Sequence, residues 1–299
     1  MDRPEQKAII LAAYGTAYPA ALPDLLAIKT RMAFAFPRIP IRLTFTSNRM
    51  RRFWRDRRAD PDRLSRHPNL PKEILEIKGP LATIADLQDS GYDVIVVQSL
   101  HIYAGEAFKD LKSIVEALRS IRTLRPGPGP FDGLALGRPA LGGPGLDHDE
   151  QADIDRAARA VAADVDRARD NRAALVYMGH GHSDIPSEIY QKFQMAVRRI
   201  HPGHPILIGV MAGEPSLDQV LDELKAMGAD KVMLAPFLFL AGGHVRRDMA
   251  GDHPGSWKMK MRRAGLEVDC LLRGLAALDA WAALSEQHIK DAMRAHGVG

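Results

Sequence analysis

Cysteine is almost missing from this chain of 299 residues, in which Cys270 is the single example. One cysteine excludes an intramolecular disulfide and a metal site made of cysteines alone, and it fits a reducing compartment. Long apolar runs are missing too, because none approaches the roughly 20 residues that span a bilayer. The run from Ala8 to Tyr14 is too short for a secretory core. We therefore expect a cytoplasmic protein with no membrane partner, in which Cys270 packs in the core.

The sequence also lacks three common catalytic patterns. Its glycines complete neither a Walker-type phosphate loop nor a dinucleotide fingerprint, and no serine lies in a G-x-S-x-G elbow. These absences argue against a nucleotide cofactor and against serine hydrolysis. The 41 basic and 37 acidic residues give a net charge of only +4, which permits an acidic partner but does not require nucleic acid. We expect no nucleic acid partner.

The order of apolar runs in the first half occurs again in the second. Four pairs of segments match in order: AIILAAYGT with ALVYMGHGH, IRLTFTSNRM with ILIGVMAGEPSL, DVIVVQSLHIYAGEAFKDL with DKVMLAPFLFLAGGHVRRDM, and LALGRPALGG with VDCLLRGLAAL. Repeated strand-to-helix units predict two similar α/β domains, residues 1–146 and 147–299, each with a parallel four-stranded sheet flanked by helices. Between two such sheets we expect a cleft that holds the active site.

Helical spacing of apolar residues predicts a helix over residues 22–35, and further helices are predicted over residues 48–58, 81–88 and 105–118. The alanine-rich stretch from Asp147 to Arg169 predicts one helical segment that leads into a strand at Ala173. That strand ends in the sequence MGHG, where Gly179 and Gly181 allow a tight exit at the carboxyl end. In open parallel sheets, ligands bind at this end of the strands.

The second half has, after each of three strands, a polar side chain that the matching position of the first half lacks. His180 follows the first strand, Glu214 the second and His244 the third. Because neighbouring parallel strands end at the same edge of a sheet, the two imidazoles and the carboxylate could converge there. Such a set suits a divalent ion such as Co²⁺, Ni²⁺, Fe²⁺ or Zn²⁺ and leaves coordination positions open. The alternative is that the three are unrelated polar residues of separate loops.

The first half has hydrogen-bonding groups, and no such ligand set, at the matching strand ends. These groups are Tyr14, Ser47, Asn48, Ser99 and His101, and they suit the binding of a polar molecule. Two interpretations of His101 stay open: a side chain that faces the ligand, or a buried histidine that is hydrogen-bonded within the protein. We therefore expect a one-sided site, with its metal ligands in the second half.

Residues 49–58, RMRRFWRDRR, form a strongly basic stretch. One interpretation is a solvated helix whose Phe53 and Trp54 face the core. The other is recognition of a polyanionic ligand, because an arginine fork matches a carboxylate or a phosphate. The candidates for that recognition lie close to strand ends or to His244: Arg49, Arg51, Arg52, Arg246 and Arg247.

The remaining candidates are interpreted as structural residues. Asp248 and Asp252 either orient a ligand histidine or cap a helix. Trp257 and Trp281 are expected to pack in the core, and His182 is expected in a loop near the site. The other histidines have no metal-like partner in the sequence and are expected on the surface: His148, His201, His204, His253, His288 and His296.

Longer segments around these residues resemble the anaerobic-type sirohydrochlorin cobaltochelatases. The resemblance rests on MGHGHS, AGEPSLDQVLDEL and APFLFLAGGHVRRDMAGDHPGSWKMK in the second half, and on AAYGTAY, LTFTSNRMRR and VQSLHIYAGEAF in the first. It implies a class II, ATP-independent chelatase of two α/β domains that inserts Co²⁺ into sirohydrochlorin, with release of two protons, in cobalamin synthesis. The family's metal-binding and catalytic set of two histidines and a glutamate falls on His180, Glu214 and His244.

The resemblance also implies a polycarboxylate tetrapyrrole as substrate. The residues expected to bind it are Tyr14, Ser47, Arg49, Ser99, His101 and Arg246. Relatives of the same architecture insert Fe²⁺ into sirohydrochlorin or protoporphyrin, so a ferrochelatase is one alternative, and a non-catalytic tetrapyrrole-binding or metal-binding protein is another. Fe²⁺, Ni²⁺ or Zn²⁺ could replace Co²⁺ in vitro. Self-association into a homo-oligomer is expected.

Overall fold

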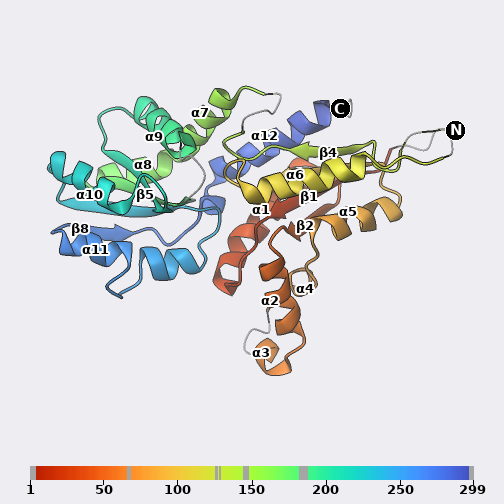
Figure 1. The fold of residues 1–299 in the computed structure, drawn as a ribbon, viewed down its shortest axis with the longest axis horizontal. Helices are drawn as coiled ribbons and strands as arrows, with labels where there is room; N and C mark the ends of the chain where they lie inside the picture. The colour runs from red at the N-terminus through yellow and green to blue at the C-terminus, as the bar shows by residue number, and fades with distance from the viewer. Residues whose placement is uncertain are drawn as a thin grey trace. The chain divides into compact units, whose positions relative to one another are not determined.

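The computed structural model describes residues 5–65, 69–124, 127, 129–143, 148–181 and 188–295. The chain forms two compact units, Met1–Leu146 together with Ala283–Gly299, and Asp147–Ala282. Each unit contains one four-stranded sheet (Figure 1). The end of the chain differs from the prediction, because the repeat assigns residues 283–299 to the second domain and they belong to the first unit.

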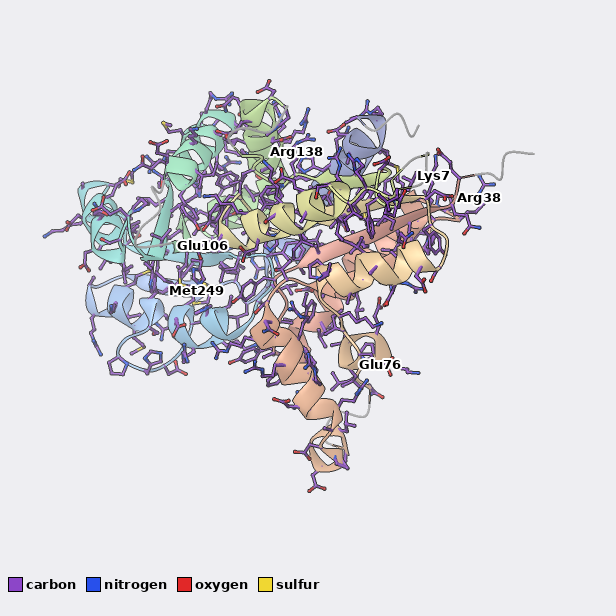
Figure 2. All side chains as sticks on the ribbon, turned by 45° about the vertical axis from the view of Figure 1, so that its right-hand side comes forward. Lys7, Arg38, Glu76, Glu106, Arg138 and Met249 are labelled. Carbon is purple, nitrogen blue, oxygen red and sulfur yellow. The ribbon has the colours of Figure 1, made fainter. Side chains whose placement is uncertain are left out.

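Helix α12 (Asp279–Ala295) carries the chain back to the first unit. There Arg138, labelled in Figure 2, forms an ion pair with Asp291, with 2.7 Å between Nη2 and Oδ2. The carbonyl of Arg138 accepts a hydrogen bond from Nδ1 of His288 at 3.1 Å. His288 is 1% exposed, so its predicted surface position is wrong. Contacts between residues so distant in sequence leave no trace in a repeat pattern.

The two sheets have the same strand order, and all neighbouring strands are parallel. The first has the order β2-β1-β3-β4, with β1 (Lys7–Ala13), β2 (Ile41–Phe45), β3 (Val94–Ser99) and β4 (Leu134–Gly137). The second has the order β6-β5-β7-β8, with β5 (Ala174–Gly181), β6 (Ile206–Ala212), β7 (Lys231–Phe237) and β8 (Glu267–Cys270). The repeat in the sequence thus corresponds to two sheets of the same topology, which confirms the predicted fold class.

Helices connect these strands. The first unit contains α1 (Leu22–Ala35), α2 (Asn48–Arg58), α3 (Pro61–Ser65), α4 (Lys72–Leu75), α5 (Pro80–Asp89) and α6 (Glu106–Arg119). The second contains α7 (Glu150–Ala160), α8 (Ala162–Asp170), α9 (Glu188–Ile200), α10 (Leu217–Ala226), the π-helical turn η2 (His244–Met249) and α11 (Trp257–Arg263). The predicted helices 22–35 and 48–58 match α1 and α2. The single segment predicted up to Arg169 is two helices, because Val161 between them has ψ 10°.

The central strands of the two sheets are buried on both faces. The buried stretches are Ala8 to Ala13 in β1 and Ala174 to Gly179 in β5, as expected where helices cover a parallel sheet. Trp257 and Trp281 are buried, and Cys270 is half-buried against the core of the second unit. Their predicted packing is therefore confirmed. In the described ranges, no helix is both long enough and apolar enough to cross a bilayer.

The units differ most after their second strand. Only residues 213–216 separate β6 from α10, whereas residues 46–79 separate β2 from α5 and contain α2, α3 and α4. Figure 1 shows these three helices extending away from the sheet of the first unit. Trp54 anchors them, since it is fully buried and its Nε1–H donates to the Thr16 carbonyl at 2.8 Å. The basic stretch is therefore a solvated helix with an aromatic anchor, on an excursion that the second unit does not share.

Candidate active site

The carboxyl ends of β6, β5 and β7 lie level at one edge of the second sheet. Gly179 of β5 pairs with Val210 of β6 and with Phe237 of β7, and Gly181 pairs with the last residue of β6. His180 lies between these two glycines and is the exposed residue of an otherwise buried strand. The central strand thus presents His180 at the edge where parallel sheets bind ligands.

His180 and His244 are in contact. The centroids of their rings are 5.3 Å apart and the ring planes meet at 89°. His244 is the first residue of η2, the turn that follows β7, and turns of this π-helical kind are frequent at functional sites. Because β5 pairs with β7, two histidines that are far apart in sequence meet at the sheet edge.

Both histidines form a hydrogen bond within the protein through the same ring nitrogen, Nδ1. Nδ1 of His180 lies 3.0 Å from the carbonyl oxygen of Gly181, and Nδ1 of His244 lies 2.7 Å from Oδ2 of Asp248. A carbonyl and a carboxylate only accept, so both Nδ1 atoms donate and carry the proton. In the neutral rings, Nε2 then keeps its lone pair. The pair therefore offers two nitrogen atoms that can bind a metal ion or accept a proton.

Asp248 is held as a carboxylate. Arg247 donates to its Oδ1 from Nε at 2.8 Å, and the hydrogen bonds from Arg247 and His244 lower the pKa of the Asp248 carboxyl. A charge-assisted bond to Nδ1 fixes the tautomer and the orientation of the His244 ring. Of the two interpretations of Asp248, the structure supports orientation of His244.

We expect Asp248→Ala to lower the initial rate of metal insertion by about 10-fold to 100-fold, because partners of this kind contribute that much to metal sites. Asp252→Ala is the matched control, since Asp252 is exposed and bonds Lys258 at 2.6 Å. Rates are measured at subsaturating metal. Equal rates for the two variants would show that Asp248 does not act through His244.

Glu214 does not join the histidines. It follows β6, in the turn before α10, and its side chain is exposed. Among the residues that the structure describes, no three of the types His, Cys, Asp and Glu come close enough to hold a metal ion. The structure thus brings two of the three predicted residues into contact, His180 and His244, and a metal-binding set that includes Glu214 stays a prediction. Strand order places a turn at an edge, but the side-chain direction depends on the backbone of that turn, where Gly213 has φ +89°.

Gly181 is required where β5 approaches β6. Its φ of +68° is strained for any residue with a Cβ. A Cβ at this position would lie 2.0 Å from the carbonyl oxygen of Ala212. Gly181, the last residue of β5, therefore has the backbone freedom that the sequence predicts, and the exit that follows it lies outside the described residues.

In the first unit, a hydrogen-bonded network around His101 joins three strand ends. Nδ1 of His101 lies 2.8 Å from Ser99 Oγ, and Nε2 lies 3.2 Å from Thr46 Oγ1. The Thr46 hydroxyl donates to the Ala13 carbonyl, so it accepts from Nε2–H. Ser99 Oγ accepts the backbone N–H of His101 and can donate its own proton to Nδ1. Of the two interpretations of His101, the structure supports the internally bonded one.

The network predicts a pH dependence of stability. Burial lowers the pKa of His101 from 6.5 to about 4, so the unfolded chain binds more protons between these values. Stability therefore falls as the pH falls from 6.5 to 4, by roughly 3 kcal/mol. Urea unfolding across this range should show a steeper loss for the parent than for His101→Gln, which has no ring to titrate. Parallel losses would contradict the prediction.

The other residues expected to bind substrate divide into two groups. Ser47 is buried and caps α2, because its Oγ accepts the Met50 N–H at 3.4 Å. Like Ser99 and His101, it forms hydrogen bonds within the protein. The exposed members are Tyr14, Arg49 and Arg246.

Among the remaining arginines, Arg51 is engaged within the first unit. Its Nη1 donates to the carbonyls of Phe45 at 2.5 Å and Thr46 at 2.8 Å. Burial and then the nearby Arg55 lower the pKa of Arg51. This arginine is therefore an anchor of α2, whereas Arg52 is exposed.

Buried polar networks in the second unit escaped the sequence analysis. Asp164 of α8 accepts hydrogen bonds from Tyr177 at 2.8 Å and from Arg273. In α7, Asp153 is fully buried, and the nearly buried His148 lies 3.3 Å from it, so the surface position predicted for His148 is wrong. An aspartate on the apolar face of an alanine-rich helix is the signal that indicates such pairs. His182 and His296 lie outside the described residues.

The sequence matches the model of the family described as cobalt chelatase (CbiK) over residues 7–294. It is 31% identical over 290 residues to the sirohydrochlorin cobaltochelatase CbiKC of Nitratidesulfovibrio vulgaris, covering 97% of this chain and 92% of that protein. It is 27% identical to the sirohydrochlorin cobaltochelatase of Salmonella typhimurium, covering 96% of this chain and 97% of that one.

Solved structures share the fold. SirB from Bacillus subtilis with Fe³⁺ matches with a TM-score of 0.58 at 13% identity, covering 98% of both chains. The sirohydrochlorin chelatase SirB from Bacillus subtilis subspecies spizizenii, in complex with cobalt, matches with a TM-score of 0.58 at 12% identity, covering 98% of this chain and 97% of that one. At such identities the likeness concerns the two-domain α/β architecture.

Proposed function

The chain belongs to the cobalt chelatase (CbiK) family, and on this premise we propose that it is an enzyme that inserts Co²⁺ into sirohydrochlorin. Two pyrrole N–H protons leave as the ion enters the macrocycle, so the reaction needs a place for the metal and an acceptor for protons. Co²⁺ is a substrate in this reaction, and no nucleotide takes part.

The observation that carries the proposal is the contact between His180 and His244. Both rings hold their proton on Nδ1, through Gly181 and Asp248, and keep Nε2 for chemistry. Imidazole nitrogens suit borderline ions such as Co²⁺. Two protein ligands leave coordination positions open for the nitrogen atoms of the incoming tetrapyrrole.

In the proposed mechanism the two histidines have different roles. His244, oriented by Asp248, acts as a ligand of the arriving ion. His180 first binds the ion through Nε2 and then, once the ion has passed to the macrocycle, accepts one pyrrole proton on the same nitrogen, while the second proton passes to solvent water. Because Nδ1 of His180 donates to the Gly181 carbonyl, the lone pair of Nε2 is the one that takes part in both steps. Glu214 remains the proposed third ligand, and it joins only if the exposed turn that carries it moves toward the pair.

The substrate's carboxylates are proposed to pair with exposed arginines. Arg246 lies two residues after His244, and Arg49 lies in the first turn of α2. A guanidinium fork binds a carboxylate through two parallel hydrogen bonds. Tyr14 adds an exposed hydroxyl, whereas Ser47, Ser99 and His101 shape the strand ends from within. That the site lies in a cleft between the domains stays a prediction.

The proposal is tested by a comparison of metals and tetrapyrroles. Purified protein is mixed with Co²⁺ or Fe²⁺, without oxygen, and with sirohydrochlorin or protoporphyrin, and product is followed by its visible absorbance. We expect repeated turnover with Co²⁺ and sirohydrochlorin. Faster insertion of Fe²⁺ would favour a ferrochelatase, and binding of one equivalent without turnover would favour a carrier.

The cellular setting of this reaction is also part of the proposal. Cobalt-containing sirohydrochlorin is an intermediate suited to cobalamin synthesis in the cytoplasm, and Fe²⁺, Ni²⁺ or Zn²⁺ could enter the same site in vitro. Self-association remains a prediction, which light scattering of the purified protein would test.

A further inference from the structure

Tyr190 touches both glycines that flank His180. It lies in the first turn of α9 and is 4% exposed. Its hydroxyl oxygen accepts a hydrogen bond from the Gly181 N–H at 3.1 Å. Its ring fills the space beside Gly179, where a Cβ would lie 2.6 Å from Cε1 of Tyr190. One side chain therefore contacts the backbone on each side of the histidine.

The ring of Tyr190 is itself held by a buried aromatic cluster. It packs against Phe237, the last residue of β7, with centroids 6.0 Å apart and planes at 67°. Phe237 in turn contacts Phe193 and Trp281. Close-packed rings of this kind have few alternative positions. Tyr190 therefore links a rigid core to the edge of the sheet.

A short series of hydrogen bonds leads from Tyr190 to the imidazole of His180. The Tyr190 hydroxyl holds the N–H of Gly181, and the carbonyl of the same glycine accepts the Nδ1–H of His180 at 3.0 Å. The direction of that carbonyl depends on the dihedral angles of Gly181, and glycine has little conformational preference of its own. A bond from a rigid side chain therefore selects the conformation of Gly181.

We propose that Tyr190 is a positioning residue for His180. By fixing Gly181, it keeps the proton of His180 on Nδ1 and leaves Nε2 as the nitrogen that meets the metal ion. This inference rests on the proposed function, because it assumes that His180 binds Co²⁺ through Nε2. It adds a residue from a helix that contributes no ligand of its own to the proposed site.

The test compares two tyrosine variants that lose the same atom. Tyr190→Phe keeps the ring beside Gly179 and removes the bond to Gly181. Tyr177→Phe is the matched control, since Tyr177 lies in the same strand as His180 and its buried hydroxyl donates to Asp164 at 2.8 Å. Loss of a buried bond to a charged partner costs more stability than loss of a bond to a backbone N–H. A general effect of destabilisation would therefore be larger in Tyr177→Phe.

Two measurements test the inference without depending on catalytic activity. Titration with Co²⁺ in the absence of tetrapyrrole measures the dissociation constant, and long-range nitrogen–proton NMR reports the tautomer of His180, assigned by its loss in His180→Ala. For Tyr190→Phe we expect a dissociation constant about tenfold higher and a mixture of tautomers. For Tyr177→Phe we expect parent values in both measurements and a lower unfolding temperature.

Parent values in Tyr190→Phe would overturn the inference, and so would equal changes in Tyr177→Phe. Failure of the proposed function is recognised separately, because the parent enzyme would then not metallate sirohydrochlorin. In that case the tautomer of His180 still decides whether Tyr190 positions the ring.

Discussion

Replacing His180 or His244 by alanine is expected to lower the rate of Co²⁺ insertion into sirohydrochlorin by at least about 10²-fold. Each substitution removes one of two imidazoles that lie in contact, with ring centroids 5.3 Å apart. A positioned acid or base contributes about 10² to 10⁴ in rate, and loss of a metal ligand acts on the same step. Initial rates are followed by the absorbance of the product, with circular dichroism to show that each variant is folded.

His204→Ala is the matched control for these variants. His204 lies just before β6, at the amino ends of the strands, whereas the proposed site lies at their carboxyl ends. The same substitution at His204 therefore leaves the proposed site intact. We expect the parent rate. If His180→Ala and His244→Ala also insert Co²⁺ at the parent rate, neither histidine takes part in the reaction.

The pH dependence of the His180→Ala variant separates the two roles of His180. Hydroxide partly replaces a lost base as the pH rises, so a deficit that shrinks with pH indicates proton acceptance. A deficit that stays constant indicates that the residue acts as a metal ligand. The measurement needs only the ratio of parent and variant rates at each pH.

Gly181→Ala is expected to destabilise the second unit by about 3 kcal/mol or more. An L-residue at φ +68° carries backbone strain of about 1–2 kcal/mol. The added Cβ would also lie 2.0 Å from the Ala212 carbonyl oxygen, and relief of such overpacking costs about 1–3 kcal/mol more. Since β5 and β6 must separate at this point, His180 moves with them and the rate of metal insertion falls as well.

Gly203→Ala isolates the backbone part of this effect. Gly203 has a similar φ of +75°, and no atom lies within 4 Å of an added Cβ, so we expect a loss of about 1–2 kcal/mol. Urea unfolding is followed by tryptophan fluorescence in a Trp54→Phe background, where Trp257 and Trp281 both report on the second unit. Equal losses for the two alanine variants would show that the contact with Ala212 relaxes without cost.

Local patterns in the sequence predicted the elements well. The apolar spacing over residues 22–35 matches α1, and the basic stretch 48–58 matches α2, residue by residue. Helix α1 buries Leu22, Leu25, Ile28 and Met32, and α2 begins after Ser47, whose side chain caps it. The same reasoning missed the break at Val161, since alanine-rich segments on either side of it carry the same helical pattern. Buried polar partners such as Asp164 and Tyr177 were missed because their contact is between different elements.

The sequence by itself determined the fold class and the family. The repeated order of apolar runs predicts two copies of one parallel sheet, and both sheets have that topology, because strand order follows from hydrophobic burial and right-handed connections. The same order placed His180 and His244 at the ends of neighbouring strands. These are properties of the backbone path, which the positions of apolar residues and glycines largely define.

Only the tertiary structure decided which side chains meet. It brings His180 and His244 into contact and leaves Glu214 exposed in its turn. It also closes His101 into a network with Ser99 and Thr46. The physical reason is that the direction of a side chain at a strand end depends on a few backbone dihedral angles and on hydrogen bonds to distant residues. None of these leaves a periodic pattern in the sequence.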